Sequence, residues 1–147
     1  MYTITEVTDR SALLIIHLLR VWERSVRATH LFLSSQEIEE IKAYVPHAMQ
    51  SVAHLIIARN DAGAPVAFMG IQDQKLEMLF LDPDERGKGL GRELFQHGVK
   101  HFGVQEVTVN EQNQQALGFY EYMGFRVYER MDLDEQGKPY PIHKMRL

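Results

Sequence analysis

The chain has 147 residues, a length that favours a single domain (1–147) with one continuous hydrophobic core. Its formal charge of −4 argues against nucleic-acid binding by bulk electrostatic attraction, and the absence of cysteine excludes disulfides, thiolate metal sites and a cysteine nucleophile. The longest apolar run, ALLIIHLL at 12–19, is too short to span a bilayer and the N-terminus has no signal-peptide pattern, so we expect a cytoplasmic protein that does not bind membranes.

The first half of the sequence predicts one strand, two helices and then three strands. Residues 2–8 alternate and are rich in β-branched types, which is typical of a strand. Helical spacing of apolar residues indicates a helix from Asp9 to about Ala28. A second helix is expected from Ser34, which has the spacing of a capping box with Glu37. The turn NDAGA joins the first two of three further strands, which we place at 52–59, 65–72 and 75–81.

The second half predicts alternating strands and helices that follow a glycine-rich loop. A helix is expected at about 92–102, and a strand at 106–111. The next helix has Asn113 as its N-cap and Gly124 as its C-terminal stop. Two last strands, at about 125–133 and 140–147, give the order βααβββαβαββ and an α/β fold.

The loop ERGKGLG, residues 85–91, predicts an anion-binding site at the start of a helix. Its glycines permit positive φ and close backbone approach, and the N–H groups of the following helix favour negative charge. Arg86, Lys88 and Arg92 add positive charge. Gly91 is followed by Arg92-Glu93 instead of the Lys-Ser/Thr of a mononucleotide P-loop, and the GxGxG spacing differs from the dinucleotide fingerprint.

The sequence resembles the GNAT superfamily of N-acetyltransferases. RGKGLG matches the signature R/Q-x-x-G-x-G/A of that superfamily, and NEQNQQALGFYEYMGF is similar to its second signature region. The resemblance implies a mixed, twisted sheet in which the parallel strands 75–81 and 106–111 splay apart around acetyl-coenzyme A. It also implies these cofactor-binding residues: Leu79, Phe80 and Leu81 through their backbone, then Arg86, Gly87, Lys88, Gly89, Leu90, Gly91, Arg92 and Asn113.

The same resemblance implies an enzyme that transfers the acetyl group to a primary amine by direct attack in a ternary complex. Tyr120 corresponds to the tyrosine that protonates the departing sulfur, although its place on an apolar helix stripe also fits a core tyrosine. Glu77 shares strand parity with Leu79 and Leu81 and is the candidate base, unless it is only a solvated strand residue. Candidate acceptor-pocket residues are Trp22, His30 and Phe32.

Other functions remain open at this point. A non-catalytic sensor of acyl-coenzyme A and a nucleotide-binding domain of another fold would both use the same loop. His97 and His101 have the i,i+4 spacing of a metal clip, but no third ligand is apparent, so we expect no metal. The acceptor, a small molecule or a peptide amine, is not identified by the sequence, and a homodimer is expected only by analogy.

Overall fold

The computed structural model describes all 147 residues and contains a seven-stranded sheet with helices on both faces. In chain order, the strands and α-helices are β1 Thr3–Glu6, α1 Ala12–Thr29, α2 Ser35–Lys42, α3 Val45–Ser51, β2 His54–Arg59, β3 Pro65–Gln72, β4 Lys75–Leu81, α4 Leu90–Phe102, β5 Glu106–Asn110, α5 Gln114–Tyr122, β6 Arg126–Met131 and β7 Ile142–Arg146. A short 3₁₀ turn, Pro83–Glu85, follows β4.

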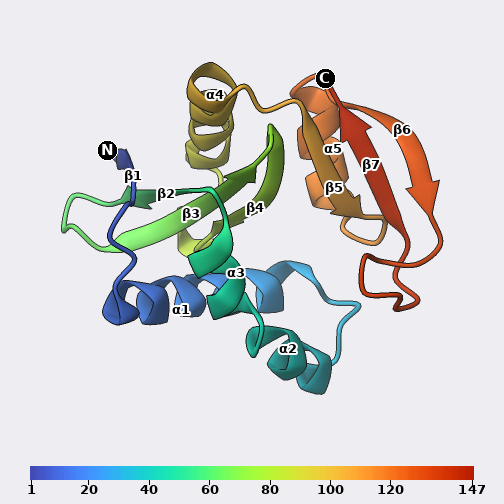
Figure 1. Cartoon of the computed structure of the whole chain (residues 1–147), viewed down its shortest axis with the longest axis horizontal. Coiled ribbons are helices and arrows are strands. Elements are labelled where there is room, and N and C mark those ends of the chain that lie inside the picture. Colours follow the sequence, from blue (N-terminus) through green and yellow to red (C-terminus); the bar gives the residue numbers. More distant parts are fainter.

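The sheet is mixed, and its only parallel pair divides it into two halves. The strand order is β1-β2-β3-β4-β5-β7-β6, and all neighbours except β4 and β5 are antiparallel. Pairing of β4 with β5 is limited to Lys75 with Glu106 and Leu76 with Val107, after which the two strands separate (Figure 1). The predicted splay of these two parallel strands is therefore confirmed.

Two hydrophobic cores, one on each face, hold the N-terminal half of the sheet. Alternate residues of β2 belong to different cores, because successive strand side chains point to opposite faces. Leu55 and Ile57 pack with α1, α2 and α3, whereas Ile56 and Ala58 pack with α4 and the residues around α5. None of the helices has the length and apolar character needed to cross a membrane.

The helices differ from the sequence prediction at two places. α1 is capped by Ser11, whose hydroxyl accepts from the Leu14 N–H, and not by Asp9. The single second helix expected from Ser34 is in fact two helices, because Pro46 has no N–H for the carbonyl of Lys42 and its ring would clash with that carbonyl. The capping box of Ser34 and Glu37 is confirmed.

Candidate active site

A cleft opens where β4 and β5 separate. It contains a cavity of about 510 Å³, large enough for a substantial part of a cofactor. Its walls come from both halves of the sheet, from the glycine loop and from α5. The lining residues are Ser25, Thr29, His30, residues 76–81, Glu85, Arg86, Gly87, residues 89–92, residues 107–110, Asn113, Gln115, Ala116, Phe119 and Tyr120.

The backbone of β4 directs polar groups into this cleft. The Asp82 N–H, just after β4, donates to the carbonyl of Val66 in β3. Hydrogen-bonded pairs alternate along an antiparallel ladder, so Phe80 also bonds to β3, whereas Leu79 and Leu81 direct their N–H and C=O groups to the other side. The family resemblance implied backbone contacts from Leu79, Phe80 and Leu81; the ladder leaves the groups of Leu79 and Leu81, and not those of Phe80, facing the cleft.

The glycine loop forms a concave backbone surface at one end of the cavity. Gly87 and Gly89 have φ of 75° and 82°, a left-handed conformation that is strained for any residue with a side chain. Gly89 is the N-cap of α4, and no side chain caps this helix, so its first N–H groups are available to an anion. Arg86 lines the same cavity and donates to the Gln115 side chain of α5 at 3.1 Å.

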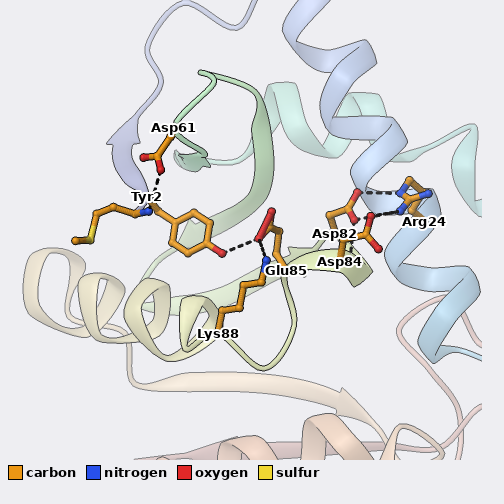
Figure 2. A network of polar contacts seen from close by, with 8 residues as sticks. Tyr2, Arg24, Asp61, Asp82, Asp84, Glu85 and Lys88 are labelled. Carbon is orange, nitrogen blue, oxygen red and sulfur yellow. Dashed lines mark hydrogen bonds and ion pairs between the residues drawn. The ribbon is translucent and has the colours of Figure 1, made fainter.

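Polar contacts that the sequence analysis missed hold the loop in place. Figure 2 shows Tyr2 and Lys88 converging on the Glu85 carboxylate, at 2.6 Å from the tyrosine hydroxyl and 3.3 Å from the lysine nitrogen. The hydrogen bond from Tyr2 and the ion pair with Lys88 lower the pKa of Glu85. Arg24 of α1 donates to Asp82 through two nitrogens, at 2.9 and 3.2 Å, and so ties α1 to the end of β4.

Comparison with known proteins identifies the family to which this cleft belongs. The sequence profile described as the acetyltransferase (GNAT) domain matches residues 26–146, most of the chain. The chain belongs to the GNAT family. It is therefore an acetyl-coenzyme A-dependent N-acetyltransferase. The cleft has apolar residues in its walls and an uncapped helix N-terminus at the glycine loop, features that suit such a donor.

Similar proteins agree with this assignment. The peptidyl-lysine N-acetyltransferase YjaB of Escherichia coli K12 is 43% identical over 129 residues, which cover 85% of this chain and 84% of YjaB. The solution structure of apo-form YjaB from Escherichia coli superposes with a TM-score of 0.88 and 37% identity, covering 99% of this chain and 97% of that one. The PaiA N-acetyltransferase of Thermoplasma acidophilum, solved with coenzyme A, has the same fold at 23% identity, with a TM-score of 0.69 and 99% of each chain covered.

Most of the residues predicted for the GNAT site meet at the cavity, and three do not. Lys88 is outside the lining and pairs with Glu85. Trp22 is only 4% exposed and packs edge-on against Phe80 in the core, which is the packing role expected of a buried tryptophan. Phe32 lies at a second cavity, described below.

Tyr120 lies at the wall of the cavity that α5 forms. Asn113 caps this helix by accepting from the Ala116 N–H, as predicted, and the helix stripe carries Tyr120 inward, where it is 7% exposed. Burial raises its pKa above the ordinary value of a phenol, and no charged group contributes to that shift. The hydroxyl therefore stays protonated at neutral pH and is suited to donate a hydrogen bond.

Glu77 lies at a β-bulge in β4. Gly70 pairs with Met78 and Ile71 with Leu76, so Glu77 has no partner on β3. The bulge interrupts the regular alternation from which a common face for Glu77, Leu79 and Leu81 was predicted, although all three residues line the cavity. Burial raises the pKa of its carboxyl, against an opposing contribution from Lys75, whose Nζ is 3.9 Å away.

His30 is the C-cap of α1 and lines the first cavity. Thr29 already donates its hydroxyl hydrogen to the Ser25 carbonyl, so the 2.9 Å contact between Thr29 Oγ1 and His30 Nδ1 requires the proton on Nδ1. Burial, and secondarily the charge of Arg86, lower the pKa of His30 to about 4. The imidazole is therefore neutral near pH 7, with Nε2 as its basic nitrogen.

A second cavity, of about 300 Å³, adjoins the first and shares Glu77, Thr108 and Asn110 with it. The remaining lining residues come from the connection between α1 and α2, from α2, from the loop between β6 and β7, and from β7: Phe32, Leu33, Glu37, Ile41, Asp134, Glu135, Gln136, Lys138, Tyr140 and Ile142. The sequence predicted Glu37 only as a helix cap and did not predict either Glu37 or Tyr140 as a cavity residue, because their contact joins residues 103 positions apart.

His97 and His101 lie outside both cavities. Their rings contact each other on α4 in a tilted arrangement, with centroids 4.4 Å apart. The structure contains no group of three residues that could hold a metal ion.

Proposed function

We propose that this enzyme acetylates the ε-amine of a lysine side chain in a peptide or protein. The observation that carries the proposal is the junction of the two cavities at Glu77: one holds the donor, and the other, named the acceptor cavity from here on, leads an amine to it. The similarity to the peptidyl-lysine N-acetyltransferase YjaB supports the choice of a lysine acceptor.

The donor is oriented by the backbone at both ends of the cleft. The N–H groups at Gly87, Gly89 and the start of α4 hold the pyrophosphate, with Arg86 supplying charge. The free edge groups of Leu79 and Leu81 bind the pantetheine arm and polarise the thioester carbonyl. This arrangement leaves the carbonyl carbon facing Glu77 and the sulfur facing α5.

Transfer proceeds by direct attack, because the chain has no cysteine to carry an acyl intermediate. Glu77, directly or through a water molecule, takes a proton from the lysine ammonium, and the amine nitrogen forms a bond to the thioester carbon. When the tetrahedral intermediate collapses, the carbon–sulfur bond breaks and Tyr120 gives its proton to the sulfur. The second amine proton leaves to the Tyr120 phenolate or to water, and Glu77 returns its proton to solvent.

A raised pKa does not make Tyr120 unsuitable for this role. The thiolate forms in the same water-poor cavity, so burial also raises the proton affinity of the sulfur. The hydroxyl can thus stabilise the developing charge by hydrogen bonding before the proton moves.

Two peptides that each carry one amine test the acceptor class. In the first, the N-terminus is blocked and a single lysine is present; in the second, arginine replaces the lysine and the N-terminus is free. Thiol release and mass spectrometry should show ε-acetylation of the first peptide and little reaction of the second. Acetylation of the second alone, or of neither, would contradict a peptidyl-lysine acceptor.

A further inference from the structure

Two segments far apart in the sequence build the outer wall of the acceptor cavity. Tyr140, in the loop between β6 and β7, donates its hydroxyl hydrogen to the Glu37 carboxylate in the first turn of α2. Phe32, between α1 and α2, packs on the Tyr140 ring with centroids 5.7 Å apart. Figure 1 shows these two connections approaching each other below β5 and β7. Glu37 and Tyr140 therefore line the acceptor cavity from α2 and from the loop between β6 and β7, whereas Glu77 lines it from the β4 bulge.

The acceptor cavity is strongly acidic. Its lining contains one cation, Lys138, whose nitrogen pairs with Glu40 at 3.8 Å. Among the cavity carboxylates, Glu135 is paired with Lys75 at 3.3 Å, whereas Glu37 has only neutral hydrogen-bond donors, the Tyr140 hydroxyl and the Ser34 N–H. The four carboxylates of the lining belong to Glu37, Glu77, Asp134 and Glu135.

A lysine that reaches Glu77 uses only one of these carboxylates. Its ammonium occupies the junction of the cavities, and the residues next to it in the peptide remain near the outer wall. The negative charge of Glu37 has no role in the chemistry at Glu77, and its capping of α2 does not require a charge, because glutamine also completes a capping box. The carboxylate is thus positioned to interact with a neighbour of the target lysine.

We propose that Glu37 and Tyr140 are specificity-determining residues, which select a lysine with a second basic residue beside it. The proposal rests on the peptidyl-lysine function given above and names its sequence preference. Glu37 supplies the charge that discriminates between neighbours. Tyr140 holds the loop between β6 and β7 against α2 and so positions the wall for every peptide.

Three peptides test this preference. Each has a blocked N-terminus and one lysine, followed by arginine, glutamine or glutamate; arginine supplies positive charge without a second reactive amine. Wild-type kcat/KM should fall in the order arginine, glutamine, glutamate, with about a fivefold step in KM for each change, the scale of a partly exposed ion pair. Added salt should reduce the differences.

Single substitutions distinguish the role of Glu37 from that of Tyr140. Glu37→Gln keeps the cap and should remove most of the discrimination among the three peptides, whereas Glu39→Gln removes a charge from the same helix outside the cavity and should retain it. Tyr140→Phe should raise KM for all three peptides and leave their ratios unchanged. If all three are acetylated equally by the wild type, or if Glu39→Gln acts like Glu37→Gln, the preference is overturned while the lysine function stands. If no peptide reacts, the proposed function itself fails.

Discussion

At the scale of single residues, Glu77 and His30 are two candidate proton acceptors that line the same cleft. Their pKa values shift in opposite directions: burial raises the pKa of the Glu77 carboxyl and lowers that of His30 to about 4. A base works only in its deprotonated form. The two residues therefore predict different acid limbs in the pH profile of kcat/KM for the acceptor.

With Glu77 as the base, activity falls as the pH drops through the raised pKa of Glu77, above the ordinary range of a glutamate. Glu77→Gln should remove this limb and reduce kcat by about 100-fold or more. His30→Asn should leave the limb where it is, because His30 is already neutral there. Steady-state kinetics across the pH range checks both variants; a limb that disappears in His30→Asn would assign the base to His30.

Residue identities near the loop and on α5 were predictable because a local pattern carries them. Tyr120 and Asn113 follow from one helix stripe and one cap, and the structure places both at the cavity. Tyr2 was not predictable as a support for the loop, because its contact with Glu85 joins residues 83 positions apart. Periodicity in a sequence contains no information about such distant contacts.

At the scale of elements, the turn into α4 depends on left-handed backbone. Gly89→Ala forces a side chain into φ of 82°, at a cost of about 1 kcal/mol of folding free energy, although an added Cβ would meet no atom. Relaxation of that strain should turn N–H groups away from the pyrophosphate and weaken acetyl-coenzyme A binding by about tenfold, measured by calorimetry.

A matched control exists in another turn. Gly63, between β2 and β3, has φ of 81° and equally open space around its missing Cβ. Gly63→Ala should therefore lose similar stability in thermal unfolding without any change in cofactor affinity. If both variants bind acetyl-coenzyme A with equal affinity, the loop does not act through its backbone conformation.

The order and type of most elements were predictable, but their interruptions were not. Pro46 divided a predicted helix because one residue removes both an N–H and the space for a carbonyl. The sequence of β4 contains no signal for the bulge at Glu77. The bulge lies opposite Gly70 of β3, where an added Cβ would be 2.5 Å from Met78 Cε. Strand alternation alone therefore could not reveal that Glu77 lacks a partner on β3.

At the scale of the whole molecule, the reaction depends on two half-sheets that share only two residue pairs. The N-terminal half contributes β4 and the glycine loop, which line the cavity and which we propose hold the donor. The C-terminal half contributes α5 and Tyr120, which line the cavity from its other side and which we propose face the departing sulfur. The resemblance to the GNAT family predicted this division, whereas composition and periodicity could not, because they say nothing of where two strands separate.

The most direct test of Tyr120 as the general acid compares Tyr120→Phe with Tyr122→Phe. Tyr122 is on the same helix but is 78% exposed, so it provides a matched control. Turnover of a lysine peptide and the Kd of acetyl-coenzyme A should be measured for both. We expect that Tyr120→Phe lowers kcat by about 100-fold or more with unchanged Kd, and that Tyr122→Phe changes neither. Equal kcat in the two variants would contradict Tyr120 as the acid that releases the thiol.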